Sequence, residues 1–138
     1  MTIEEVDLRI FELNKQQKKK ILVVEDNMIN SIVLKKILES NHFEVSVAED
    51  GKLGVEATLT FHPDLILMDI NMPVMNGYES TIAIRNLEAP FNAIPIFAVT
   101  AELSPETIVK VKEAGMNEYL PKPVDVNELM TTILKYIK

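Results

Sequence analysis

The sequence contains no cysteine and only two histidines among its 138 residues. Without cysteine, disulfide bonds and zinc sites built on thiolates are excluded. The longest apolar runs contain only a few residues, whereas a transmembrane helix needs roughly 20. The chain opens with acidic residues and lacks the apolar stretch of a secretory signal peptide. These absences predict a soluble, cytoplasmic protein that does not enter a membrane.

Basic charge is also scarce outside the N-terminal segment. The formal net charge is −7, yet residues 1–20 carry five basic and four acidic side chains. The remaining residues therefore carry nine basic and seventeen acidic side chains. A body this acidic repels nucleic acid, so we expect no nucleic-acid partner. The length predicts a single domain, and a hydrophobic content of 47% is enough for a substantial core.

Short apolar runs alternate with stretches of helical spacing from Lys20 onward. The runs are rich in valine, isoleucine and leucine and mostly lack polar alternation, which is typical of strands buried on both faces. They occupy residues 21–24, 43–48, 65–68, 96–99 and 119–120. Strands that alternate with helices predict an α/β fold, in which right-handed crossovers connect the strands of a doubly wound parallel sheet.

Capping residues mark where the intervening helices begin and end. Asp50, Ser104 and Asp125 each precede a helical stretch and can accept a hydrogen bond from its first backbone amides. Asn76 lies in a turn that leads into another helix. Gly115 is a predicted left-handed cap at the end of the helix that begins after Ser104.

Residues 1–19 lie outside this alternation, and we interpret them as an N-terminal extension to a domain that spans residues 20–138. The extension has heptad-spaced apolar residues at Ile3, Val6, Ile10 and Leu13. A polar, basic linker follows them. We expect a partly helical or disordered segment, although the same spacing fits the end of a coiled coil that dimerises the chain. The sequence leaves a monomer and a weak dimer both open.

Polar groups follow three of the predicted strands. Asp69 ends the third strand, and Thr100 ends the fourth. Glu25 and Asp26 follow the first strand. Because the carboxyl ends of parallel strands meet at one edge of a sheet, we expect these groups to lie together. Clustered carboxylates repel each other, so they need a cation, or one of them must hold a proton. Oxygen ligands without cysteine or paired histidine suit Mg²⁺ or Mn²⁺ rather than zinc.

An aspartate at such a site can also act as a nucleophile toward phosphorus and form an aspartyl phosphate. Lys122, which follows the fifth strand, is placed to supply an ammonium group to the transferred phosphoryl group, and Thr100 to supply a hydroxyl. Prolines flank Lys122 on both sides, and the bond between Lys122 and Pro123 is a candidate cis peptide bond.

Four motifs together resemble the receiver domain of two-component response regulators. They are Glu25-Asp26, the stretch from Met68 to Gly77, Val99-Thr100-Ala101 and Lys122-Pro123. The resemblance runs from about Lys20 to Lys138, and the stretch from Met68 to Gly77 is particularly similar to receivers attached to hybrid sensor kinases. It implies a flavodoxin-like, chemotaxis-regulator-like sandwich, with a five-stranded parallel sheet in the order 2-1-3-4-5.

The resemblance implies that Asp69 accepts a phosphoryl group from a histidine kinase or a histidine phosphotransfer protein. Asp26 and Asp69 would bind Mg²⁺ directly, with the backbone carbonyl of Asn71 as a further ligand. Glu25 would act through a metal-bound water. The acidic pair is Glu-Asp rather than the Asp-Asp of other members, which is a mild departure.

The resemblance also implies a switch. Lys122 would pair with Asp69 and then with the phosphoryl oxygens. Thr100 would bind a phosphoryl oxygen and draw its loop inward, and Tyr119 would follow as an aromatic switch. A downstream protein, or a second copy of the chain, would then dock on the surface of residues 104–137.

The histidine-bearing partner would approach the rim around Asp69 and residues 27–34. A domain of this kind catalyses its own phosphorylation and dephosphorylation without being a turnover enzyme. It either stands alone or forms part of a hybrid histidine kinase.

Two other functions stay open on the residues alone. A phosphatase of the haloacid dehalogenase type also uses a strand-end aspartate, but it needs a second aspartate two residues later, where this chain has Asn71. A non-phosphorylated binding module would have lost motif residues, and none is missing here. We interpret His42 and His62 as structural, because neither has a likely ligand as a neighbour in the sequence.

Overall fold

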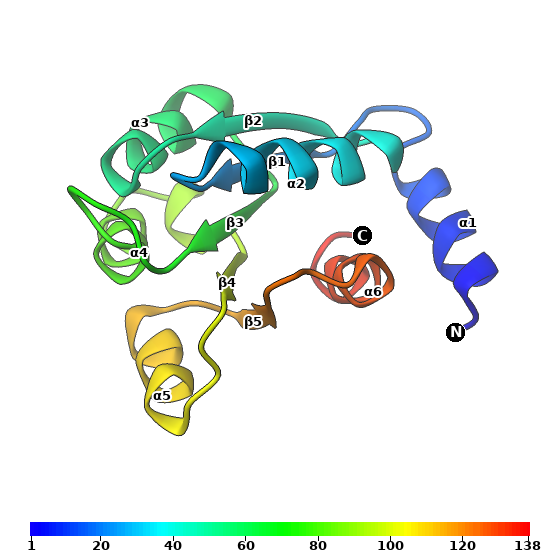
Figure 1. The fold of residues 1–138 in the computed structure, drawn as a ribbon. Helices are drawn as coiled ribbons and strands as arrows, with labels where there is room; N and C mark the ends of the chain where they lie inside the picture. The colour runs from blue at the N-terminus through cyan, green and yellow to red at the C-terminus, as the bar shows by residue number, and fades with distance from the viewer.

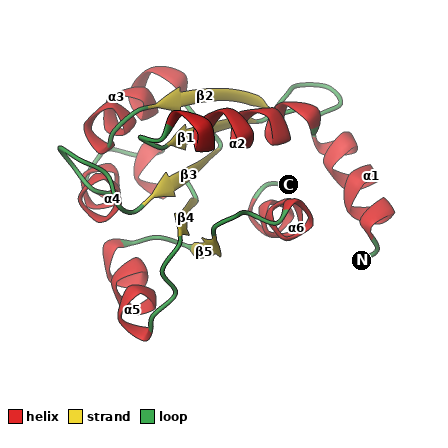
Figure 2. Cartoon of the chain, viewed as in Figure 1, coloured by secondary structure: helices red, strands yellow, loops and turns green.

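The computed structural model describes all 138 residues and contains one parallel sheet with helices on both faces (Figures 1 and 2). The strands lie in the order β2-β1-β3-β4-β5, so the order implied by the resemblance is confirmed. The strands are β1 (Lys20–Val24), β2 (Glu44–Ala48), β3 (Leu65–Asp69), β4 (Ile96–Thr100) and β5 (Glu118–Pro121). Each predicted strand agrees with the observed one to within one residue at either end.

The helices form two layers that cover the sheet. One layer contains α1 (Ile3–Leu13), α2 (Met28–Ser40) and α6 (Val126–Tyr136). The other contains α3 (Gly51–Phe61), α4 (Gly77–Arg85) and α5 (Pro105–Ala114), and a short 3₁₀ helix (Phe91–Ala93) precedes β4. No helix is both long enough and apolar enough to cross a membrane.

Alternate strand residues supply the two cores between sheet and helices. In β1, Ile21 and Val23 belong to the core on the α2 and α6 side, whereas Leu22 and Val24 belong to the opposite core. β3 and β4 are buried at every position, as the unbroken apolar runs predict. β2 is partly exposed because it is an edge strand.

The predicted caps at Asp50, Ser104 and Asp125 are confirmed, because each side chain accepts a backbone hydrogen bond at the start of a helix. Asn76, which the sequence placed in a turn, caps α4 in the same way. Gly115 has a φ of 99°, a left-handed conformation that costs glycine little. These local signals set the register in which each helix meets the sheet.

The N-terminal segment contains a helix that packs against α6 (Figure 1). Val6 and Ile10 of α1 are each 1% exposed and share a core with α6, whereas Ile3, the first residue of the heptad pattern, is 61% exposed. Asn14 ends the helix, and its buried side-chain amide donates to the carbonyl of Asn41 at 3.2 Å. The helix therefore belongs to the packed layer, and self-association through it stays a prediction.

Candidate functional site

Polar side chains from four strands meet at one edge of the sheet. β3 ends on Asp69 and β4 on Thr100, while Lys122 directly follows β5. Glu25 and Asp26 directly follow β1. The carboxylates of Glu25, Asp26 and Asp69 each offer an oxygen within 4.8 Å of the others. The convergence that we expected from the strand ends is present in the structure.

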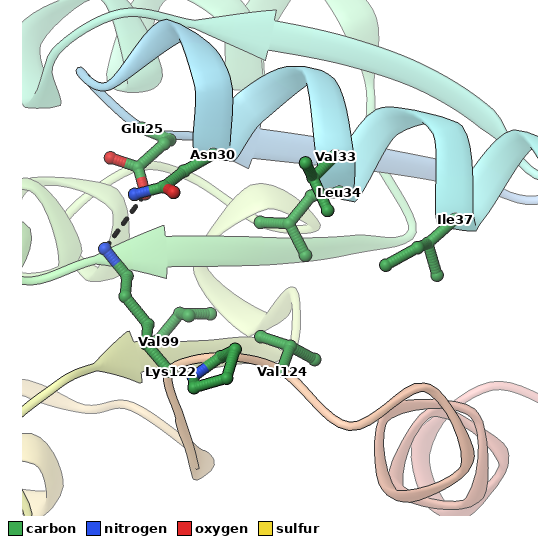
Figure 3. Close-up of a pocket in the computed structure, with 9 residues that line it drawn as sticks. Glu25, Asn30, Val33, Leu34, Ile37, Val99, Lys122 and Val124 are labelled. Carbon is green, nitrogen blue, oxygen red and sulfur yellow. Dashed lines mark hydrogen bonds and ion pairs between the residues drawn. The ribbon is translucent and has the colours of Figure 1, made fainter.

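The Lys122 ammonium lies between two buried carboxylates. Its Nζ donates to Oε1 of Glu25 at 2.9 Å and to Oδ1 of Asp69 at 3.0 Å. Figure 3 shows the Lys122 side chain extending toward Glu25. The peptide bond to Pro123 is cis, as predicted. Glu25 is 3% exposed and Asp69 is 6% exposed, so two buried carboxyl groups share one cation.

The electrostatics of the site follow from this imbalance of charge. Burial raises the pKa of Asp69, the Glu25 carboxylate raises it further, and the Lys122 ammonium opposes both, which leaves the pKa at about 7. Burial also acts to raise the pKa of Glu25, but hydrogen bonds from Lys122 and the Asn27 amide outweigh it and lower that pKa. Around neutral pH, Asp69 therefore holds a proton for part of the time unless another cation enters.

The donor set fits a hard divalent cation. Asp26 is exposed and takes part in neither ion pair of the site. Three carboxylates face one ammonium, so a further cation would relieve their repulsion. All three groups are oxygen donors, which Mg²⁺ prefers over the nitrogen and sulfur donors that zinc selects. The residues present therefore fit Mg²⁺.

The loop after β3 is held in a tight path. A Cβ on Gly77 would lie 2.2 Å from the backbone oxygen of Asp69, so only glycine fits there. Val74 has a φ of 69° in a three-residue turn closed by the Met75 amide on the Pro73 carbonyl at 2.7 Å. Such γ-turns are rare and strained. Val74 is 82% exposed in the loop that follows Asp69.

Thr100 and Asn71 line a polar hollow of about 160 Å³ between the loops that follow β3 and β4. The Thr100 hydroxyl accepts a hydrogen bond from the Glu102 amide at 3.0 Å and donates to the Glu102 carbonyl at 3.2 Å. Tyr119 is 37% exposed and lies outside the lining of this hollow. Thr100 is therefore bound to its own loop, and Tyr119 faces solvent in part.

An apolar groove of about 250 Å³ opens next to the carboxylates (Figure 3). Val33, Leu34 and Ile37 of α2 form one wall, and Val124 forms part of the other. Pro123 also lines the groove. The groove ends at the ion pair between the ammonium and the carboxylate that follows β1. The site is thus charged at its centre and apolar on the side of α2.

The outer face of α2 carries an exposed apolar patch. Met28 and Ile29 are each 72% exposed, Val33 is 50% exposed and Ile32 is 46% exposed. We call these four residues the α2 patch. Exposed apolar side chains grouped next to a polar site make a candidate protein-binding surface. It lies within the stretch of residues 27–34 at which the sequence places a partner.

The sequence reasoning missed two features of the site. The first is the direct contact between Lys122 and Glu25, two residues that lie 97 positions apart in the sequence. The second is the apolar groove, whose walls come from opposite ends of the chain. The only sequence signal for the groove was the helical spacing of apolar residues that include Val33 and Ile37, both of which line it.

Comparisons with known proteins agree with this geometry. The family model of the response regulator receiver domain matches residues 21–134. The CAI-1 autoinducer sensor kinase/phosphatase CqsS of Vibrio cholerae is 35% identical over 122 residues, which cover 88% of this chain and 18% of that protein. A peroxide stress-activated histidine kinase of Schizosaccharomyces pombe is 37% identical over 131 residues, which cover 91% of this chain and 6% of that protein.

Solved structures show the same likeness. The receiver domain of the sensor histidine kinase PA1611 from Pseudomonas aeruginosa, with magnesium in its active-site cleft, has a TM-score of 0.81 and 35% identity, and the match covers 87% of this chain and 98% of that one. A receiver domain from Saccharomyces cerevisiae, crystallised with a histidine phosphotransfer protein, has a TM-score of 0.78 and 30% identity. The match covers 87% of this chain and 89% of that one.

The chain spans less than a fifth of the length of these curated relatives. The matched region nevertheless contains the whole acidic site and all of the strands except Lys20, the first residue of β1. From its sequence, its sheet order and its site, the chain belongs to the response regulator receiver domain family.

Proposed function

We propose that the domain accepts a phosphoryl group from a phosphohistidine onto Asp69 and passes the signal on by changing a binding surface. The observation that carries this proposal is the buried Asp69 carboxylate, whose Oδ1 lies 3.0 Å from the Lys122 ammonium in a site of oxygen donors only. A buried acid beside a fixed cation is well placed for group transfer, because the cation stabilises the negative charge that develops on the phosphoryl group.

In the reaction, a carboxylate oxygen of Asp69 attacks phosphorus and forms an acyl phosphate. The bond from phosphorus to the imidazole nitrogen of the donor breaks, and that nitrogen leaves with its electron pair and takes up a proton. Lys122 then shifts its hydrogen bond from the carboxylate to a phosphoryl oxygen. Hydrolysis by water reverses the modification and restores the carboxylate.

We assign Mg²⁺ as the cofactor, held directly by Asp26 and Asp69. The backbone carbonyl of Asn71 would be a further ligand, and Glu25 would act through water. Bound there, the ion neutralises charge on the acceptor and on the incoming phosphoryl oxygens. The magnesium ion in the receiver of the sensor histidine kinase PA1611 supports this assignment.

The switch begins at Thr100. Its hydroxyl must leave the Glu102 backbone, to which it is bound here, before it can reach a phosphoryl oxygen. Tyr119, which is partly exposed, would then turn inward toward the space beside Thr100. The surface of residues 104–137 would change shape and bind a downstream protein or a second copy of the chain.

The phosphohistidine donor would dock on the α2 patch. This surface lies beside the acidic site, and a donor histidine that reaches Asp69 must bring its own protein against α2. The complex of a phosphotransfer protein with a receiver of the same fold supports this class of partner. The donor is then a histidine kinase or a histidine phosphotransfer protein, and the chain acts alone or as part of a hybrid kinase.

Incubation with acetyl phosphate and Mg²⁺, followed by intact-mass measurement, tests the proposal. The expected result is one added phosphoryl group that is absent in Asp69→Asn and in a sample treated with EDTA. An unchanged mass, or equal labelling of Asp69→Asn, would contradict the assignment. Sustained hydrolysis of p-nitrophenyl phosphate would instead favour the phosphatase, which Asn71 disfavours because it cannot act as the second acid.

A further inference from the structure

The two ends of α5 are held very differently. At the N-terminal end, every residue from Glu102 to Glu106 is exposed. The side-chain hydrogen bonds there connect residues 100–107 with each other, and the Tyr78 hydroxyl of α4 reaches Thr107. At the C-terminal end, Ala114 is 7% exposed and Met116 is 5% exposed. The end that joins the Thr100 loop is therefore exposed up to Glu106, and the other end is packed.

One guanidinium fastens the packed end. Arg85, the last residue of α4, donates from Nε to the Gly115 carbonyl at 2.9 Å and from Nη2 to the side-chain oxygen of Asn117 at 3.0 Å. Its Nη1 donates to the carbonyls of Ile94 at 2.8 Å and Asn92 at 3.1 Å. The planar fork of arginine allows these four bonds at once, whereas the single ammonium of a lysine does not.

The same network reaches the sheet. The side-chain oxygen of Asn117 also accepts a hydrogen bond from the backbone amide of Ile96, the first residue of β4, at 2.8 Å. The backbone amide of Asn117 in turn donates to the Ile96 carbonyl at 2.8 Å. A Cβ on Gly115 would lie 3.0 Å from Cγ of Arg85, so the side chain of Arg85 fills the space beside this glycine. The end of α5 is thus tied to α4 and to β4 together.

From this asymmetry we propose that Arg85 is the pivot about which α5 swings when Asp69 is phosphorylated. The inference rests on the proposed function and describes how that site is read. A pull on Thr100 moves the loop that leads into Ser104, while the hydrogen bonds of Arg85 to Gly115 and Asn117 hold the C-terminal end of α5 in place. Helix α5 then tilts about its C-terminal end, so the displacement of the chain is largest at residues 102–108.

Hydrogen–deuterium exchange on the full chain, with and without beryllofluoride and Mg²⁺ as a phosphoryl mimic, tests the pivot. In the wild type, exchange is expected to change at residues 102–108 and to stay constant at 112–117. In Arg85→Lys, which keeps the charge and loses the fork, exchange at 112–117 should rise on the order of tenfold and should also respond to the mimic. Arg9→Lys, on the exposed side of α1, is the matched control and should behave as the wild type.

An even response along residues 102–117 in the wild type, or unchanged exchange at 112–117 in Arg85→Lys, would overturn the pivot. If Arg85→Lys does not fold, Gly115→Asn serves instead, because asparagine tolerates positive φ and its Cβ crowds Arg85. The acetyl phosphate assay separates the two proposals. A chain that takes up no phosphate overturns both, whereas normal uptake with an even exchange response overturns the pivot alone.

Discussion

Asp69 is an acid that is buried more completely than its charge favours. Its pKa of about 7 means that the folded protein binds a proton at pH values where the unfolded chain, with an ordinary value of 3.8, has released it. A raised carboxyl pKa lowers stability as pH rises from about 4 to about 7, and the loss is complete above that range. The function of the site thus has a cost in folding free energy when no metal is bound.

Replacing the acid should recover that free energy. In EDTA at pH 8, we expect the free energy of unfolding of Asp69→Asn to be about 1 kcal/mol higher than that of the parent protein. This difference in stability should shrink toward pH 4. Urea unfolding followed by circular dichroism across this range provides the measurement. Equal stability of the two proteins at pH 8 would show that the carboxylate is not strained by its surroundings.

Asp26 offers a second test at the level of a single residue. Asp26→Asn should weaken Mg²⁺ binding by about tenfold, because a carboxylate ligand becomes a neutral amide. Its effect on unfolding should stay within about 0.5 kcal/mol, because Asp26 is exposed and outside both ion pairs of the site. Calorimetric titration with Mg²⁺ measures the affinity, and Glu113→Gln, a change of the same kind on α5, serves as the control. Unchanged affinity in Asp26→Asn would remove this residue from the metal site.

At the scale of single elements, α2 carries both a buried face and the α2 patch. Ile29→Glu should slow phosphotransfer from a phosphorylated histidine phosphotransfer protein by about tenfold, since a charge at the centre of an apolar interface disrupts docking. Labelling by acetyl phosphate needs no docking and should be unchanged. Rapid-quench measurement of both reactions provides the comparison.

Ile82→Glu is the matched control for this change. Ile82 is 49% exposed on α4, in the opposite helical layer, so it carries a similar apolar side chain away from the proposed interface. Equal slowing in the two variants would argue against a docking role for the α2 patch.

α1 can be tested by comparing two isoleucines of one helix. Ile10→Ala should lower the free energy of unfolding by about 2–4 kcal/mol, because its side chain is 1% exposed in the core shared with α6. Ile3→Ala should change it by less than about 0.5 kcal/mol, since Ile3 is 61% exposed. Chemical denaturation gives both values, and similar effects in the two variants would show that α1 does not dock as described.

At the scale of the whole molecule, the sequence predicted the sheet and the position of Asp69 because strands, caps and strand-end residues are local signals. It did not predict what Lys122 touches besides Asp69, because the contact with Glu25 joins distant parts of the chain. The hydrogen-bond partners of Arg85 could not be predicted either, because three of its four hydrogen bonds go to backbone carbonyls, which every residue carries. The place of α1 depended on packing against α6, which heptad spacing alone cannot distinguish from packing against another chain.

The packing of α1 against α6 also fixes where the two ends of the polypeptide lie. Leu8 and Arg9 of α1 line the same hollow as Lys138, and in Figure 1 both termini lie on the side away from the tip of β3. A short peptide that joins them would therefore not cross the strand end that carries Asp69. The domain is thus suited to circular permutation and to insertion within another protein, with its reactive face left open to solvent.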